Sequence, residues 1–138
     1  MNWKRILVGG IVAGAVMNVL DMLVGLLVLE GRYKALQDAG IYLKQPRLHF
    51  VPLWILGMFA MGLIAAWFYA AVRPRLGPGP RTALIVGLAL GLMSHVAYNV
   101  SAASWGAQGR FLPLMWMGSG IVELVVGTLV AGCIYKEE

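Results

Sequence analysis

The sequence predicts an all-α integral membrane protein folded as a bundle of four transmembrane helices. Three observations support this prediction: hydrophobic residues make up 60% of the 138 positions, charged residues make up only 12%, and the apolar residues gather into long runs. A soluble domain has about 45–50% apolar residues with glycine included, and its apolar positions alternate with polar ones. The whole chain, residues 1–138, is therefore expected to form a single transmembrane domain.

Each apolar run is long enough to cross a bilayer, because about 20 residues at 1.5 Å each span a hydrocarbon core of about 30 Å. The first run, residues 6–29, is too long for the apolar part of a cleavable signal peptide, so we expect a retained helix. The later runs cover residues 51–72, 82–104 and 112–135. These four runs leave little of the chain for a soluble domain.

The connections between the runs differ in length and composition. The longest loop, residues 30–50, mixes apolar and charged residues, which predicts either a short helix on the membrane surface or a solvated loop. The segment from Leu76 to Pro80 is rich in proline and glycine. Proline removes a backbone donor and glycine permits positive φ, so this segment predicts a tight turn between antiparallel helices.

An even number of helices places both termini on one side of the membrane. Six basic residues are expected on that side and five on the other: Lys4, Arg5, Arg73, Arg75, Arg81 and Lys136 against Arg32, Lys34, Lys44, Arg47 and Arg110. The short loop of residues 73–81 concentrates positive charge, and such loops stay in the cytoplasm. We therefore expect both termini to be cytoplasmic.

The net charge of +5 does not indicate nucleic-acid binding, because the basic residues flank apolar runs. Cys133 is the single cysteine, so an internal disulfide is excluded. No spacing typical of a structural zinc site occurs, and we predict no metal site.

Two pairs of matching motifs suggest an internal duplication. Glycines four residues apart, followed after four more by a polar residue, occur from Gly10 to Asn18 and from Gly87 to His95. A Phe-x-Pro-Leu motif occurs at residues 50–53 and again at 111–114. The matches predict two duplicated helix pairs in a parallel repeat, although glycine-rich membrane helices also produce such matches by chance.

Small residues spaced at helical intervals predict where the helices approach closely. Residues four apart lie on one helix face, and glycine lets two backbones come near each other in lipid. The predicted packing glycines are Gly10, Gly14, Gly87, Gly91, Gly120 and Gly127.

Five polar side chains are expected to lie near one depth in the bilayer. At 1.5 Å per residue from the nearest basic flank, Asn18, His95 and Glu123 lie about 20–21 Å deep. Asp21 and Asn99 follow at about 24 and 27 Å. A charged side chain at the bilayer centre costs about 2.5–3.5 kcal/mol even on a lenient scale, so these groups should be partnered or protonated.

The simplest cluster places the imidazole of His95 between the carboxyl groups of Asp21 and Glu123. Asn18 and Asn99 would then satisfy the remaining hydrogen-bonding positions. Such a group of side chains suits proton relay and also has ligands for a small cation. A simpler alternative is that His95 and Asp21 only join neighbouring helices through hydrogen bonds.

We therefore hypothesise a small membrane protein, assembled as a homo-oligomer, that binds or passes a proton, ion or small polar molecule. The alternative is a non-catalytic accessory subunit that docks against other subunits of a larger membrane complex. A weaker alternative is haem or chlorin binding through His95, with a second histidine from a partner copy. No other cofactor is expected, and no pair of nucleophile and base indicates an enzyme.

Three segments resemble a group of small bacterial four-helix membrane proteins. They are residues 9–21, the loop Tyr-Ala-Ala-Val-Arg-Pro-Arg-Leu-Gly-Pro-Gly-Pro at residues 69–80, and the last run with Glu123. The resemblance implies a bacterial cytoplasmic membrane as the location and four spans as the architecture. That group has no assigned activity, so the resemblance implies no catalytic residue.

Overall fold

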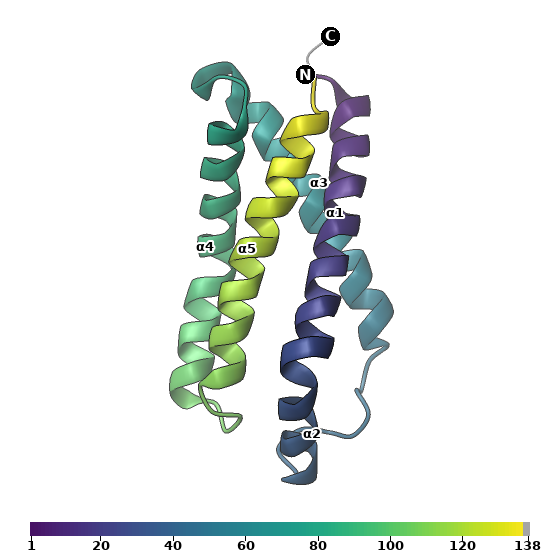
Figure 1. Cartoon of the computed structure of the whole chain (residues 1–138), viewed down its shortest axis with the longest axis vertical. Helices are drawn as coiled ribbons and strands as arrows, with labels where there is room; N and C mark the ends of the chain where they lie inside the picture. The colour runs from purple at the N-terminus through teal and green to yellow at the C-terminus, as the bar shows by residue number, and fades with distance from the viewer. Residues whose placement is uncertain (137–138) are drawn as a thin grey trace.

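The computed structural model describes residues 1–136 and has the four-helix bundle that the sequence predicts. Its helices, in chain order, are α1 (Trp3–Val24), the π-helix η1 (Gly25–Leu29), α2 (Glu30–Asp38), α3 (Phe50–Leu76), α4 (Pro80–Trp105) and α5 (Phe111–Ile134). The long helices run along one axis, and both termini lie at the same end of the molecule (Figure 1). Four helical segments are long and apolar enough to cross a membrane.

The first helical segment is longer than predicted, because α1 continues through η1 into α2 and ends at Asp38. The predicted first run, residues 6–29, therefore ends earlier than the continuous helical segment. Of the two alternatives for residues 30–50, a short helix is present at Glu30–Asp38, and residues 39–49 form the loop. Good helix formers fill α2, and Lys34 Nζ lies 3.4 Å from Glu30 Oε1, one turn away. Gly40 follows with a φ of 71°, the left-handed conformation that commonly ends a helix.

The turn between α3 and α4 forms where the proline and glycine residues predict it. Gly77 and Gly79 both have positive φ, 85° and 118°, and Pro80 is the first residue of α4. The Thr82 hydroxyl donates a hydrogen bond of 2.7 Å to the carbonyl oxygen of Gly77. The turn holds α3 and α4 close together at the end where the termini lie (Figure 1).

Glycines bring the helices of each hairpin into backbone contact. A β-carbon placed on Gly62 of α3 would lie 2.5 Å from the carbonyl oxygen of Gly10 and 2.6 Å from the amide nitrogen of Gly14. In the other hairpin, a β-carbon on Gly87 of α4 would lie 2.7 Å from the Cα of Val125 in α5. The hairpins α1–α3 and α4–α5 are thus each closed by glycine, and α5 also packs against α1 and α3.

The proposed duplication has a structural parallel in these hairpins. Each second helix begins at the phenylalanine of a Phe-x-Pro-Leu motif, Phe50 in α3 and Phe111 in α5. Each first helix contributes glycines to the contact with the second. The duplication itself stays a prediction.

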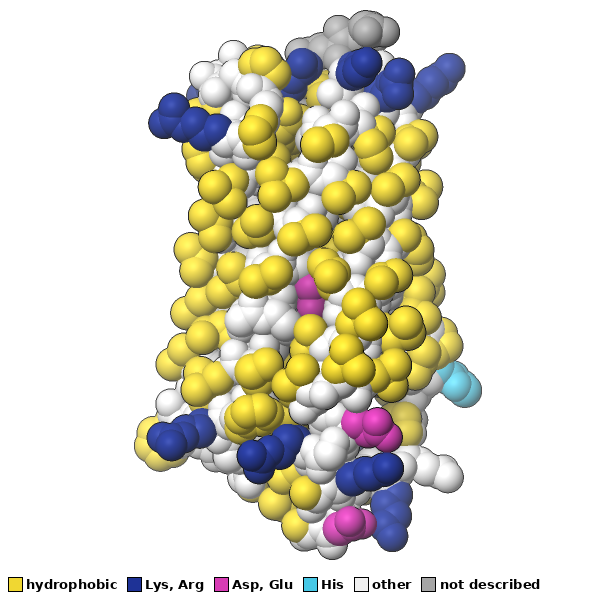
Figure 2. Space-filling model, in the orientation of Figure 1, with side chains coloured by type: hydrophobic (Ala, Val, Ile, Leu, Met, Phe, Trp, Pro, Cys, Tyr) yellow, Lys and Arg dark blue, Asp and Glu magenta, His cyan; other side chains and the backbone are white. Residues whose placement is uncertain are grey.

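The surface between the two ends of the bundle is apolar. Leu27, Met93 and many other large hydrophobic side chains are exposed on the helices. They form a belt around the molecule, with lysine and arginine side chains gathered above and below it (Figure 2). An exposed apolar surface of this extent needs lipid around it, which fits a protein embedded in a membrane.

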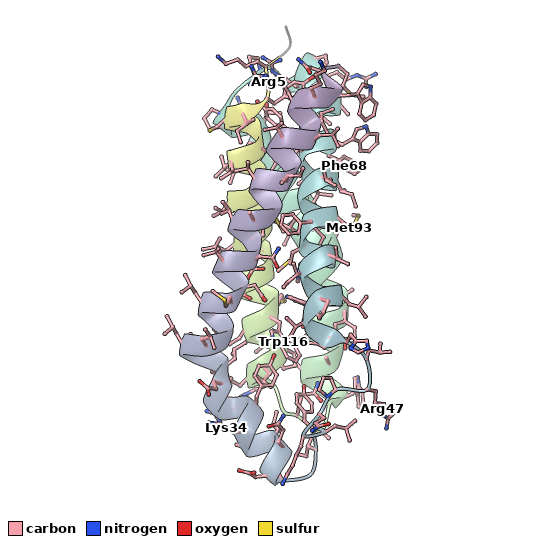
Figure 3. The ribbon with its side chains drawn as sticks, turned by 90° about the vertical axis from the view of Figure 1, so that its right-hand side faces the viewer. Arg5, Lys34, Arg47, Phe68, Met93 and Trp116 are labelled. Atoms are coloured by element: carbon pink, nitrogen blue, oxygen red, sulfur yellow. The ribbon has the colours of Figure 1, made fainter. Side chains whose placement is uncertain are left out.

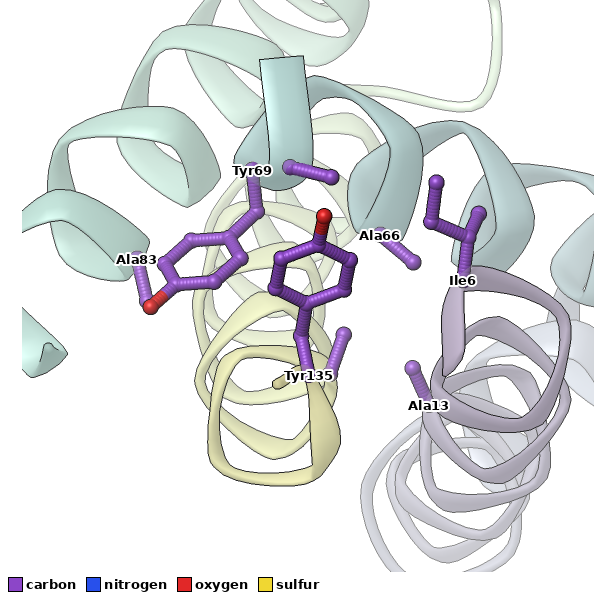
Figure 4. Close-up of a cluster of buried hydrophobic side chains, with 8 residues drawn as sticks. Ile6, Ala13, Ala66, Tyr69, Ala83 and Tyr135 are labelled. Atoms are coloured by element: carbon purple, nitrogen blue, oxygen red, sulfur yellow. The ribbon is translucent and has the colours of Figure 1, made fainter. Parts of the chain in front are cut away.

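One cluster of buried side chains lies at the end of the bundle where the termini lie. Small residues there surround two tyrosines, Tyr69 and Tyr135, whose ring centroids are 6.0 Å apart (Figure 4). A second cluster lies nearer the middle and contains Met17, Met58, Ala65, Val86, Leu90 and Leu124. Together these clusters fix the helices on which the polar side chains lie.

Candidate polar site around helix α5

Glu123 lies inside the bundle, halfway along α5. Glu123 is only 4% exposed, and its Oε1 has no hydrogen-bond partner among the described residues. It lies about 18 Å along the axis from the start of α5, at 1.5 Å per residue. The structure therefore contains a buried carboxyl group with an unused acceptor at the depth that the sequence predicts.

Asp21 lies on the last turn of α1, away from the termini, and its side chain is hydrogen-bonded to α3. The indole Nε1 of Trp54 donates a hydrogen bond of 2.7 Å to Asp21 Oδ2. Asp21 is half-buried, and α1 packs against α5, the helix that carries Glu123. The two acids of the predicted cluster therefore lie on neighbouring helices, and each has a different environment.

Asn18 connects α1 to α3 rather than to the acids. Its Nδ2 donates to the carbonyl oxygen of Gly14 at 2.9 Å and to that of Ile55 at 3.4 Å. The second contact crosses between helices, and it is available because Gly14 and Gly62 bring the two backbones together. In this structure Asn18 is a packing residue beside the site.

His95 does not bridge the two carboxyl groups, which corrects the arrangement expected from the sequence. No ion pair joins its ring to Asp21 or Glu123 within residues 1–136. Its Nδ1 lies 2.7 Å from the hydroxyl of Ser94, and its Nε2 edge packs against Gly120. The reason is topological: α4 and α1 flank α5 on opposite sides (Figure 1), and Gly120 gives the ring space against the α5 backbone.

Gly120 precedes Glu123 by one helical turn, so His95 contacts the turn of α5 next to the buried acid. Asn99, one turn further along α4, donates from Nδ2 to the carbonyl oxygen of His95 at 2.8 Å. Asn99 is 4% exposed, and its Oδ1 has no partner among the described residues. The α4–α5 hairpin thus holds two buried oxygen acceptors without partners.

The other predicted packing glycines also lie at helix contacts. A β-carbon on Gly91 would come 3.0 Å from the Cα of Ile121, and one on Gly127 would come 2.6 Å from the sulfur of Met17. These contacts keep α4 and α1 against α5 on both sides of Glu123.

Aromatic residues close the cluster at the end away from the termini. Trp116 Nε1 of α5 donates a hydrogen bond of 3.0 Å to the hydroxyl of Tyr33 in α2. The ring of Tyr42 lies 6.1 Å from that of Tyr33, and burial raises the pKa of the Tyr42 phenol above its ordinary value. Figure 3 shows Trp116 between the helices at this level. The helical extension α2 is therefore held against α5.

The sequence did not identify the aromatic partners. Trp54 and Trp116 have the appearance of interfacial or packing residues in a membrane helix. Depth in the membrane could have indicated the contact between Trp54 and Asp21. Asp21 is near the end of the first apolar run and Trp54 is near the start of the second, so both are expected at the same depth. The hydrogen bond between Trp116 and Tyr33 could not be found from depth, because it depends on the position that the helix α2 gives to Tyr33.

Among the described residues, no group of three His, Cys, Asp or Glu side chains is placed to hold a metal ion. The Nδ1 of His95 lies beside the Ser94 hydroxyl, and its Nε2 lies against Gly120. Binding of haem or chlorin through His95 stays a prediction.

The contact between Trp54 and Asp21 should contribute to stability. Trp54→Phe keeps the ring and removes the N–H donor, so we expect the free energy of unfolding to fall by about 1–2 kcal/mol. Trp105→Phe is the matched control, because Trp105 is 89% exposed and makes no hydrogen bond within residues 1–136. Denaturant titration in detergent micelles measures both variants. Equal losses in the two would contradict a stabilising role for the bond.

Comparison with known proteins gives no family for the chain: no protein-family profile matches it, and neither does any curated protein or solved structure.

Proposed function

We propose that this protein binds and exchanges a proton at Glu123 inside the membrane. The observation that supports the proposal is the buried Glu123 carboxyl, whose Oε1 has no partner among the described residues. An ionised carboxylate in hydrocarbon costs about 2.5–3.5 kcal/mol on a lenient scale, and binding a proton removes that cost. A functional role is the default expectation for an intramembrane acid in such a position.

Asp21 and His95 are the side chains that we expect to exchange protons with Glu123. Asp21 lies on α1, which packs against α5, and it is nearer than Glu123 to the end where residues 39–49 form the loop. On the other side, His95 packs one turn from Glu123 and contacts Ser94, which is exposed at the surface of α4. A proton that leaves Glu123 therefore has a carboxyl acceptor toward one end of the bundle and an imidazole beside it.

A proton suits the site better than a metal cation. Hard cations take about six or more oxygen ligands, whereas the described residues offer two buried side-chain acceptors without partners, Glu123 Oε1 and Asn99 Oδ1. A small polar molecule would need several such groups facing one cavity. For that reason we place the proton first among the ligands suggested by the sequence.

The location and assembly belong to the same proposal. We place the protein in a bacterial cytoplasmic membrane with both termini in the cytoplasm, because the short basic loop of residues 73–81 is at that end. We also propose a homo-oligomer, since four helices enclose little volume and exposed helix faces remain for a second copy.

Proton flux into vesicles tests the proposal. We expect the purified protein, reconstituted alone, to pass protons down a pH gradient, and Glu123→Gln to reduce that flux by about a hundredfold, the low end of what a positioned acid–base group contributes. The control is Glu30→Gln, since Glu30 is an exposed acid paired only with Lys34. A fluorescent pH indicator inside the vesicles reports the rate.

Two outcomes would count against proton exchange. Unchanged flux in Glu123→Gln would show that the buried acid has no part in it. Absence of flux in the unmodified protein, together with co-purification at a fixed ratio with other membrane subunits, would favour the accessory-subunit alternative.

A further inference from the structure

An apolar groove runs along one side of α3. It consists of two adjoining cavities with volumes of about 260 and 160 Å³. The larger cavity is lined by Leu48 and by one face of α3 that includes Gly57, and the smaller one lies between α3, α4 and Leu124 of α5. Met61 lines both cavities, so the two cavities adjoin at this side chain.

The groove reaches from one end of α3 to the middle of the bundle. It extends from Leu48, just before α3 begins, to Ile64 and Leu90 near the middle of their helices. From Phe50 to Ile64 the helix rises about 21 Å, which exceeds the roughly 15 Å of half a hydrocarbon core. The groove is therefore long enough for one acyl chain of the leaflet on the side of the 39–49 loop.

Positive charge lies at the outer end of the groove. Arg47 directly precedes Leu48, the first lining residue, and His49 directly follows it. Lys44 is in the same loop, residues 39–49, which contains no acidic residue. Lys44 and Arg47 are exposed, and neither forms an ion pair in the part of the chain that the structure describes. Figure 3 shows Arg47 at the end of α3, with Met93 higher along the same side.

We propose that this groove binds an anionic phospholipid of the leaflet on the side of the 39–49 loop. One acyl chain lies along α3 against Gly57, Met61 and Leu124, and the phosphate group lies beside Arg47 and Lys44. Gly57 is central to the fit, because open space surrounds the position of its missing β-carbon. An apolar groove with cations at its outer end matches an amphiphile with one charged end. This inference does not depend on proton exchange at Glu123.

Native mass spectrometry of the delipidated protein in detergent tests the site. With phosphatidylglycerol we expect one lipid to bind saturably per chain, more tightly than phosphatidylcholine with identical acyl chains. A basic residue near a lipid headgroup contributes about a fivefold difference in affinity, so Arg47→Gln should weaken phosphatidylglycerol about fivefold and leave phosphatidylcholine unchanged. Lys136→Gln, at the other end of the bundle, is the charge control.

A second pair of variants tests the groove itself. Gly57→Leu should fill the groove and weaken the binding of both lipids. This loss of affinity should exceed the fivefold loss that Arg47→Gln causes for phosphatidylglycerol. Gly118→Leu is the matched control, because Gly118 on α5 also has nothing within 4 Å of a β-carbon and does not line the groove. Circular dichroism confirms that both variants keep the helical fold.

Three results would overturn the proposal. Equal affinity for the two lipids, or unchanged phosphatidylglycerol binding in Arg47→Gln, would remove the anionic site. Dissociation of an oligomer by Gly57→Leu, with lipid binding unchanged, would show that a second copy of the chain occupies the groove.

Discussion

Replacing Gly62 with leucine is expected to lower the free energy of unfolding by about 3 kcal/mol, the upper end for overpacking a core. A β-carbon at this position would lie 2.5 Å from the carbonyl oxygen of Gly10 and 2.6 Å from the amide nitrogen of Gly14. Both atoms belong to the backbone of α1, so no flexible side chain can move aside. The two helices must separate, and the apolar contacts beside the glycines are lost with them.

Thermal unfolding in detergent, followed by circular dichroism, measures this effect. Gly118→Leu is again the control, because it adds the same side chain where nothing lies within 4 Å, and its melting temperature should match that of the unmodified protein. Equal melting temperatures for Gly62→Leu and Gly118→Leu would mean that α1 and α3 are not held by this contact.

Replacing Glu123 with methionine is expected to raise the free energy of unfolding by about 1–3 kcal/mol while abolishing proton flux. The carboxyl is buried, its Oε1 has no partner among the described residues, and an unsatisfied buried polar group costs about that much. Methionine has a similar length and no polar group that needs a partner. A gain in stability combined with a loss of activity is the usual result at a functional site.

Glu30→Met provides the comparison for that experiment. Glu30 is exposed and has only a one-turn ion pair with Lys34, so its loss should change stability by no more than about 0.5 kcal/mol. If Glu123→Met were less stable than the unmodified protein, the carboxyl would be a structural group, and the proton-binding proposal would lose its support.

Hydropathy predicted most of the fold, because a helix in lipid must be apolar for its whole crossing. The observed bounds of α3, α4 and α5 differ from the predicted runs of residues 51–72, 82–104 and 112–135 by one or two positions, apart from a tail of α3 that includes Pro74. The end of the first helix was not predictable in this way. Hydropathy falls at Glu30, whereas backbone hydrogen bonding continues through η1 into α2.

The depth of the candidate site residues could be predicted, but the rotation of each helix about its axis could not. Counting residues along the helices placed Asp21 and Glu123 at neighbouring levels, and the helices that carry them pack together. Whether a side chain faces a given neighbour depends on how each helix is turned and on which helices touch. His95 illustrates the difficulty, since it has the expected depth but faces Gly120 because α4 and α1 lie on opposite sides of α5.

The glycine contacts within each hairpin have a consequence for biogenesis. Gly62 meets α1 and Gly87 meets α5, so each tight contact joins helices that follow one another along the chain. Contacts between neighbouring segments form quickly, because little loop entropy opposes them. Each helical hairpin can therefore assemble as soon as its second helix leaves the translocon. The meeting of Gly9 with Ala131, which joins the two hairpins, has to wait until α5 has been synthesised.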